Sequence, residues 1–200
     1  MATIKYAIAD DHEVFRKGLK LILSDDETLN FVFEASHGQE LIEKLATNHI
    51  DVVLLDLKMP VMDGFETAKV LKRKFPEIKI LILSMFEEEQ FILHMMESGA
   101  NGYLLKNASP EEITKALHIV TENNYYFNDL VSAVMLKKIM DKDYVQPKFK
   151  SPVNLNERDI QVLRLICEGK TAQEIGDEVF LSPRTVEGIR AGIMDKIGVK

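Results

Sequence analysis

The sequence is poor in the features that mark secreted and membrane-bound proteins. Its 200 residues include a single cysteine, Cys167, so no disulfide can form within the chain, which suits a reducing compartment. No apolar run approaches the roughly 20 residues that a membrane-spanning helix needs, and the first residues lack the long apolar core of a signal peptide. These absences predict a cytoplasmic protein without a membrane partner.

Positive charge is also in short supply. Lysine and arginine total 25 against 32 aspartate and glutamate residues, which gives a formal net charge of −7 at pH 7. Such a charge argues against wholesale coating of nucleic acid. No glycine-rich turn follows the first apolar segment, which disfavours a dinucleotide-dependent enzyme. The hydrophobic content of 46% is that of an ordinary globular protein, and this length suits one large domain or two small ones.

One stretch, residues 51–64, organises the first half of the chain. It contains four consecutive apolar residues, Val52 to Leu55, which are typical of a strand buried on both faces. Asp56 follows directly, so its carboxylate should project from the carboxyl end of that strand, where open α/β sheets bind ligands. Asp63 and Gly64 then predict a turn before the next helix.

Strand-like and helix-like segments alternate through residues 1–122. This βα alternation predicts an α/β domain with a five-stranded parallel, doubly wound sheet and helices on both faces. The predicted strands are 6–9, 31–35, 51–56, 79–84 and 103–105. The predicted helices are 14–23, 39–46, 65–74, 88–97 and one that begins at 109–110.

Polar groups close four of the five strands. The first strand ends in Asp10 and Asp11, the third in Asp56, the fourth in Ser84 and the fifth in Lys106. In a parallel sheet these ends share one edge, where three carboxylates repel one another unless a cation is present. Mg²⁺ suits them because it prefers oxygen and usually joins one or two carboxylates to a phosphate. With a lysine to neutralise a phosphoryl oxygen, the set indicates phosphoryl transfer to a carboxylate.

Each of these residues also has a plainer interpretation. A lone aspartate after a strand is usually a turn residue, and Asp10 and Asp11 could merely cap the helix that follows. Ser84 alone is uninformative, Tyr103 alone is more often core than switch, and Lys106 alone could be a solvated charge. Taken together, they favour the functional interpretation.

Six positions carry a resemblance to a known family. They are Asp10, Asp11, Asp56, Ser84, Tyr103 and Lys106. In order and spacing they resemble the receiver domain of two-component response regulators, over residues 3–122. The resemblance implies a flavodoxin-like fold in which a sensor histidine kinase phosphorylates Asp56. A phosphohydrolase with an aspartate nucleophile would want a second carboxylate two residues further on, where this chain has Lys58.

The same resemblance implies a role for each position. Mg²⁺ would be bound by Asp11, Asp56 and the backbone carbonyl of Lys58, and Asp10 would assist through water. The aspartyl phosphate would be contacted by Lys106 and Ser84, and Tyr103 would swing inward as Ser84 moves.

Two helices carry apolar patterns that predict which face they bury. The inward face predicted for the helix at 14–23 consists of Val14, Leu19, Ile22 and Leu23. In the helix at 88–97, Phe91 and Leu93 lie off the inward stripe. Two alternatives stay open for this helix. It is broadly buried, or, because it follows Ser84, Phe91 and Leu93 belong to a surface that is exposed or rearranged by phosphorylation.

The composition changes after residue 122. A helix is predicted over 129–140, and the charges and prolines that follow mark an exposed linker. Residues 155–198 show three helical patterns and no strand, and two short helices joined by a tight turn describe a helix-turn-helix. The predicted organisation is therefore a receiver at 1–122, a linker with one helix at 123–152 and a small all-α domain at 153–200.

The second domain resembles the LuxR-type DNA-binding domain, and the whole chain therefore resembles a NarL/FixJ-family response regulator. Residues 155–163, 169–175 and 181–186 carry the match. The family normally adds a fourth helix, so the domain is expected to be truncated at its C-terminus. By resemblance, the third helix enters the major groove of promoter DNA. The candidate DNA contacts are Arg184, Thr185, Glu187, Gly188, Arg190 and Ala191, with Lys170, Thr171 and Lys196 as candidates for phosphate contacts.

The charge of the second domain leaves its output open. Residues 151–200 hold seven Lys and Arg residues against eight Asp and Glu residues, a net charge of −1. Because phosphate contacts normally carry affinity for DNA, we expect weak monomer binding that depends on a homodimer formed on phosphorylation. An output domain that binds protein instead of DNA is the main alternative. Either way, no enzymatic activity is expected beyond phosphorylation and dephosphorylation of the receiver aspartate.

Overall fold

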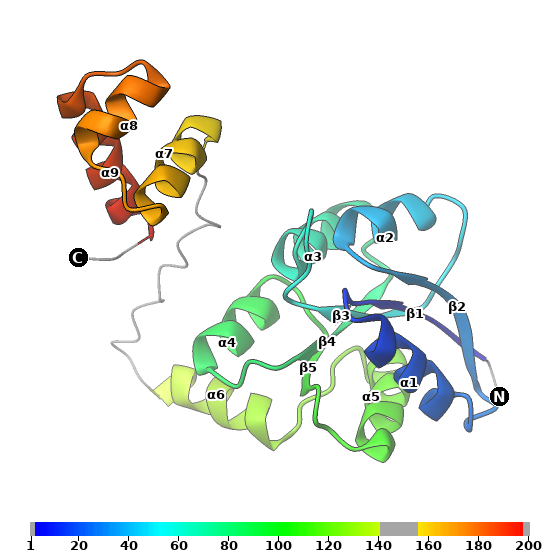
Figure 1. The fold of residues 1–200 in the computed structure, drawn as a ribbon. Coiled ribbons are helices and arrows are strands. Elements are labelled where there is room, and N and C mark those ends of the chain that lie inside the picture. The colour runs from blue at the N-terminus through cyan, green and yellow to red at the C-terminus, as the bar shows by residue number, and fades with distance from the viewer. Residues whose placement is uncertain (1–2, 141–155, 198–200) are drawn as a thin grey trace. The chain divides into compact units, whose positions relative to one another are not determined.

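The structure is a computed structural model that describes residues 3–140 and 156–197 (Figure 1). The chain divides into two compact units, one on each side of the segment that is not described. The first unit is built on a sheet of five parallel strands, and the described part of the second consists of three helices. The predicted fold class, an α/β domain followed by a small all-α domain, is confirmed.

Strands and helices alternate along the first unit, and the sheet order is β2-β1-β3-β4-β5. The strands are β1 (Ile4–Ala9), β2 (Leu29–Ala35), β3 (Val52–Asp56), β4 (Lys79–Ser84) and β5 (Gly102–Leu105). The helices are α1 (Glu13–Leu23), α2 (Gly38–Lys44), α3 (Gly64–Lys74), α4 (Glu89–Glu97), α5 (Pro110–Asn123) and α6 (Asp129–Met140). The element boundaries predicted from sequence agree with these within two residues.

The central strand β3 is buried on both faces, as its apolar run predicts. Val53 and Leu55 belong to one core cluster, which also contains residues of α2, α3 and α4. Val52 and Leu54 belong to a second cluster with residues of α1 and α5, two helices that lie side by side (Figure 1). Because both faces are covered, Asp56 can reach solvent or a ligand only at the carboxyl edge of the sheet.

The predicted inward face of α1 is wrong at two positions. The side chains of Val14 and Ile22 are 84% and 40% exposed. The buried residues of this helix are Arg16, Leu19 and Leu23, which follow one another at spacings of three and four. The apolar pattern was misleading because a cation occupies the inward row.

The surface role expected for Leu93 is also wrong, because this residue is buried in the core. Helix α6 packs against α4, and Val131 and Val134 of α6 join the core cluster that contains Leu93. Phe91 is half-buried, with its ring centroid 4.7 Å from that of Phe86. The helix expected within the linker therefore covers part of α4.

A polar pair links the turn before β2 to α5. Nε2 of His118 lies 2.8 Å from Oδ2 of Asp26, and the backbone N–H of Thr28 donates to Oδ1 of Asp26 at 2.9 Å. Hydrogen bonds from His118 and Thr28 lower the pKa of Asp26 to about 2.

We expect Asp26→Asn to lower the free energy of unfolding at pH 7 by about 1 kcal/mol. This is the contribution of a charge-assisted hydrogen bond after it is reduced by solvent screening. The folded-state pKa of Asp26 lies below its ordinary value of 3.8, so the contribution is complete above 3.8 and is lost as the pH falls through about 2. Urea unfolding at pH 7 and pH 3 measures this, with Asp25→Asn as the control. A difference from the wild type that does not narrow at pH 3 would contradict the assignment.

The second unit contains α7 (Glu157–Cys167), α8 (Ala172–Val179) and α9 (Pro183–Ile197). Apolar residues from all three helices form one small core. Asn156 and Thr171 begin α7 and α8 with capping boxes, and Phe180 ends α8 in the left-handed region, with φ of 56°. In the described parts of both units, no helix has the length and apolar character needed to cross a membrane.

Candidate functional site

The strand ends bring the predicted acids and lysine together at one edge of the sheet. Nζ of Lys106 lies 2.7 Å from Oδ2 of Asp10 and 2.9 Å from Oδ2 of Asp56. Asp10 and Asp56 are only 1% and 4% exposed. A single ammonium group thus joins the ends of β1, β3 and β5.

Burial and charge act in opposite directions on these groups. Burial raises the pKa of Asp56, the hydrogen bond and charge of Lys106 counteract this, and the Asp10 carboxylate adds to the rise. Burial by itself would lower the pKa of Lys106, but its hydrogen bonds to Asp10 and Asp56 outweigh this and raise that pKa. Lys106 therefore stays charged at neutral pH and offsets part of the repulsion between the two carboxylates.

Four side chains at this edge are placed to hold a metal ion. One ligand atom from each of Asp10, Asp11, His12 and Asp56 lies within 4.8 Å of the others. The three carboxylates are the hard oxygen donors that Mg²⁺ prefers, so the residues fit the predicted cofactor. The imidazole of His12 was missed in the sequence analysis. Lys58 has an exposed side chain, and ligation through its backbone carbonyl stays a prediction.

The two predicted switch residues meet at the loop between β4 and α4. Oγ of Ser84, which is fully buried, accepts a hydrogen bond of 3.1 Å from the backbone N–H of Phe86. The Tyr103 hydroxyl donates to the backbone carbonyl of Phe86 at 2.7 Å, and burial raises the pKa of Tyr103 to about 12. Tyr103 is 0% exposed, so its ring already lies inward in this structure. Ser84 and Tyr103 thus hold the same loop residue from two sides.

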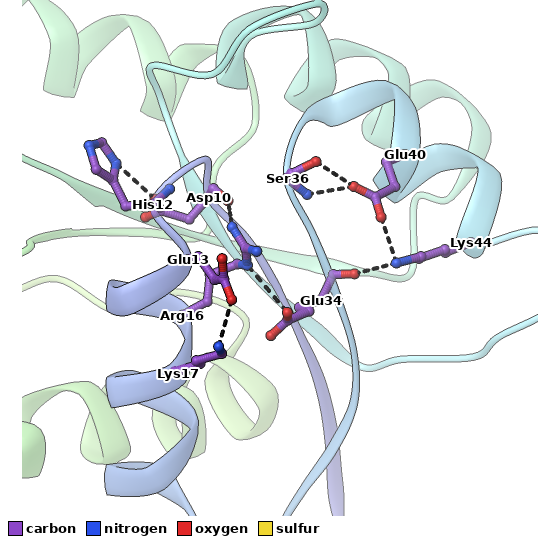
Figure 2. Close-up of polar contacts among 9 residues, drawn as sticks. All are labelled: Asp10, His12, Glu13, Arg16, Lys17, Glu34, Ser36, Glu40 and Lys44. Atoms are coloured by element: carbon purple, nitrogen blue, oxygen red, sulfur yellow. Dashed lines mark hydrogen bonds and ion pairs between the residues drawn. The ribbon is translucent and has the colours of Figure 1, made fainter.

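Arg16 supports the acidic turn from α1 and was not singled out from the sequence. Its side chain is nearly buried, and its Nη1 donates to the backbone carbonyl of Asp10 at 2.7 Å (Figure 2). Oδ1 of Asp10 in turn accepts a hydrogen bond of 2.8 Å from the backbone N–H of His12. The turn that carries Asp10 and Asp11 is therefore fixed both by Arg16 and by its own carboxylate. The helical spacing of Arg16 from Leu19 was the signal that could have revealed it.

The same network continues from Arg16 to α2. Nε of Arg16 lies 3.6 Å from Oε1 of Glu34, whose backbone carbonyl accepts a hydrogen bond of 2.7 Å from Lys44 (Figure 2). Lys44 also pairs with Glu40, and the hydrogen bonds of Glu40 with Lys44 and with Ser36 lower the pKa of Glu40 to about 2. The acidic turn is thereby tied through β2 to the neighbouring helix.

We expect Arg16→Gln to weaken Mg²⁺ binding about 10-fold, the effect typical of losing a residue that orients a metal ligand. Isothermal titration calorimetry with Mg²⁺ gives the measurement. Arg16→Lys should recover most of the affinity because it keeps an N–H donor for the Asp10 carbonyl. Lys17→Gln, which removes an exposed cation from the next position, is the control. Unchanged Mg²⁺ affinity in a folded Arg16→Gln protein would refute this positioning role.

In the second unit, the predicted base contacts gather on α9. All six residues are exposed, and positions 184, 187, 188 and 191 recur at spacings that share one helical face. They are Arg184, Thr185, Glu187, Gly188, Arg190 and Ala191. Nη1 of Arg190 lies 3.9 Å from Oε1 of Glu187, so part of the positive charge on this face is offset within the helix.

Two of the three predicted phosphate contacts have partners inside the domain. Lys170 pairs with Glu178 and lies 3.5 Å from Glu168. The hydroxyl of Thr171 caps α8 by accepting from the backbone N–H of Glu174 at 3.3 Å, and it donates to the Glu174 carboxylate at 2.7 Å. Lys196 falls in α9, but its side chain lies outside the described part of the structure.

Comparison with known proteins agrees with the fold. Residues 7–118 match the response regulator receiver domain, and residues 153–200 match the bacterial regulatory proteins of the luxR family. The chain belongs to the NarL/FixJ family of two-component response regulators, in which a receiver is joined to a LuxR-type DNA-binding domain that regulates transcription.

Individual relatives cover nearly the whole chain. Oxygen regulatory protein NreC of Staphylococcus aureus (strain MRSA252) is 35% identical over 203 residues, which span 98% of this chain and 92% of that protein. DegU of Brevibacillus brevis is 28% identical, and the alignment spans 98% of this chain and 88% of that protein. The structure of RcsB from Salmonella typhimurium aligns with a TM-score of 0.64 at 28% identity, over 100% of this chain and 94% of that one. The structure of an RcsB–DNA complex aligns with a TM-score of 0.62 at 27% identity, and the alignment covers 99% of this chain and 93% of that chain.

Proposed function

We propose that Asp56 accepts a phosphoryl group from a sensor histidine kinase and that this modification controls DNA binding by the second domain. The contact of Lys106 with both Asp10 and Asp56 carries the proposal, because it places a cation beside the acceptor carboxylate. A carboxylate oxygen of Asp56 attacks phosphorus as the bond to the donor histidine nitrogen breaks. The positive charge of Lys106 offsets the negative charge on the phosphoryl oxygens. Mg²⁺, held by Asp10, Asp11, Asp56 and the Lys58 carbonyl, would neutralise further phosphoryl charge when bound.

The proposed switch lies in the loop between β4 and α4. The Ser84 hydroxyl now accepts from the Phe86 backbone. If Ser84 turns to the phosphoryl group, that hydrogen bond is lost and Phe86 is free to shift while Tyr103 keeps its inward position. Since α4 begins three residues later, the movement would reach α4 and the helix α6 that packs on it. Such a two-state loop favours the homodimer of the phosphorylated form.

We propose that the receiver spans residues 1–122, the linker residues 123–152 and the DNA-binding domain residues 153–200. The exposed face of α9 would enter the major groove of promoter DNA. Support comes from RcsB, a relative solved in complex with DNA and as two dimers on two parallel DNAs. We place the protein in the cytoplasm because both promoter DNA and the kinase's phosphohistidine would be met there.

A DNA titration tests this function. The full chain is mixed with a random-sequence DNA library at low and high salt, with and without Mg²⁺ and beryllofluoride, which mimics the aspartyl phosphate. We expect selected sequences to bind more tightly with beryllofluoride, more weakly at high salt, and with a doubled mass in light scattering. Asp56→Asn should show none of the response to beryllofluoride. Failure to select any DNA at low salt would overturn the DNA-binding output.

One observation favours a second candidate, an output domain that binds protein. The net charge of −1 over residues 151–200 and the pairing of Lys170 with Glu178 leave little free positive charge for phosphates. A beryllofluoride-dependent dimer that selects no DNA at either salt concentration would favour this candidate.

A further inference from the structure

We propose that α6, together with the residue before it, Asn128, is a strap that holds α4 in the arrangement of the unphosphorylated receiver and so opposes phosphorylation of Asp56. Phosphorylation in turn loosens the strap. The inference rests on the proposed function, because it adds a regulatory contact to the same switch. It assigns that contact to an amide hydrogen bond at one end of the strap and to two ion pairs near the other.

The first end of the strap is anchored to the sheet. Oδ1 of Asn128 accepts a hydrogen bond of 3.0 Å from the backbone N–H of Val131, as an N-cap residue does. Nδ2 of the same side chain donates to the backbone carbonyl of Tyr103 in β5 at 3.3 Å. One side chain therefore begins α6 and ties it to the strand that carries a switch residue.

The middle of the strap packs on α4. Val131 and Val134 are buried and belong to the same core cluster as Leu93 of α4. The two helices lie side by side (Figure 1). Apolar burial keeps helices together but has no preferred direction. The valines therefore attach α6 to α4, and polar contacts have to fix where α4 lies.

Two ion pairs supply these polar contacts. Nζ of Lys137 lies 2.8 Å from Oε1 and 2.8 Å from Oε2 of Glu89, and the neighbouring Lys138 pairs with Glu97. Glu89 and Glu97 are the first and the last residue of α4. Two adjacent lysines of the strap thus hold both ends of α4.

The end of α4 that Lys137 holds is the end that the switch loop would move. Glu89 lies three residues after Phe86, whose backbone is contacted by Ser84 and by the Tyr103 hydroxyl. The ring of Phe86 also packs on Phe91 of α4, with 4.7 Å between the ring centroids. A shift of Phe86 would therefore move the start of α4 relative to β5. Because the strap contacts both β5 and α4, this shift must weaken one of its contacts.

Thermodynamic linkage turns this conflict into a measurable effect. A contact that is made in the unphosphorylated arrangement and lost in the other opposes phosphorylation by as much as the contact contributes. Its removal must then favour the phosphorylated arrangement. We expect Lys137→Glu to raise the affinity for beryllofluoride in the presence of Mg²⁺ about threefold, which is within the range for one exposed ion pair.

Isothermal titration calorimetry of the full chain with beryllofluoride at a fixed Mg²⁺ concentration gives the measurement. Glu89→Lys should raise the affinity as Lys137→Glu does. The double variant Lys137→Glu/Glu89→Lys restores a pair of opposite charges, so its affinity should return to that of the wild type. Lys74→Glu makes the same change of charge at an exposed lysine of α3 and should leave the affinity unchanged.

Amide hydrogen exchange over residues 129–140 reports on the strap itself. In the wild type, Mg²⁺ with beryllofluoride should speed exchange in this segment. Lys137→Glu should speed it without beryllofluoride. Lys137→Gln removes the charge without introducing repulsion, so it replaces Lys137→Glu if circular dichroism shows that the reversed variant is unfolded.

Three results would overturn the strap. They are faster exchange of α6 in Lys137→Glu with an unchanged or reduced affinity for beryllofluoride, exchange of α6 that responds to neither change, and a double variant that does not recover the affinity of the wild type. Each of them leaves the proposed function intact as long as the wild type binds beryllofluoride. A folded wild-type chain that binds no beryllofluoride with Mg²⁺ overturns the proposed phosphoacceptor site, and the strap with it.

Discussion

Asp56→Asn should abolish phosphorylation of the chain by acetyl phosphate in the presence of Mg²⁺. Asparagine keeps the shape of the side chain but replaces the attacking carboxylate oxygen with an amide that is a poor nucleophile. The Lys106 ammonium would remain beside Asp10, so the loss cannot be attributed to a missing cation. Intact-protein mass spectrometry measures the gain of one phosphoryl group in the wild type and its absence in the variant.

Asp63→Asn is the matched control for this experiment. Asp63 lies seven residues after Asp56, and its carboxylate caps α3 by accepting from the backbone N–H of Glu66 at 2.8 Å. Its labelling should equal that of the wild type. Label that persists in Asp56→Asn would refute the assignment of the phosphoacceptor, even if the DNA-binding output proved correct.

Asp56→Asn should also raise the free energy of unfolding at neutral pH. Burial raises the pKa of Asp56 in the folded state, so the folded protein favours the protonated carboxyl more than the unfolded chain does. The wild type therefore becomes more stable as the pH falls and this carboxylate is protonated. At neutral pH the ionised carboxylate destabilises the folded protein. We expect Asp56→Asn to unfold at a higher urea concentration than the wild type at pH 7, with the gain shrinking toward lower pH.

The arrangement of this site was predictable because it follows from topology. Alternating strands and helices force a parallel sheet, and a parallel sheet places the ends of β1, β3, β4 and β5 on one edge. The position of Asp56 at the end of a buried strand was enough to place its carboxylate at that edge. The role of Asp63 as a turn and cap residue was also predictable, because its hydrogen bond reaches only three residues along the chain.

Residues whose role depends on packing were missed for physical reasons. Arg16 was overlooked because an apolar pattern treats a cation as outward, although its guanidinium reaches the Asp10 carbonyl. His12 carries no periodic signal, and only the fold of the turn brings its ring to Asp11. Leu93 was assigned to the surface because nothing in the sequence of α4 reveals that α6 returns to cover it. Local pattern predicts elements and their order, whereas these contacts arise between elements.

Gly64→Ala should lower the free energy of unfolding by about 2 kcal/mol, within the range for overpacking of a tightly packed site. A Cβ atom at this position would lie 2.3 Å from the backbone oxygen of Asp56 and 2.7 Å from the Cα of Leu57. Both are backbone atoms of the segment that carries Asp56, so no side chain can move away to relieve the clash. The backbone N–H of Gly64 also donates to the carbonyl of Leu57 at 2.9 Å, which ties α3 to this segment.

The same substitution should reduce labelling of Asp56 by acetyl phosphate, because relief of the clash displaces the acceptor from Lys106. Urea unfolding and mass spectrometry measure the two effects on one preparation. Gly18→Ala is the control: a Cβ there meets nothing within 4 Å, and alanine in a helix should raise stability by up to about 1 kcal/mol. A Gly64→Ala protein as stable and as readily labelled as the wild type would show that the backbone behind Asp56 can move freely. The turn at Gly64 would then have no part in holding Asp56 against Lys106.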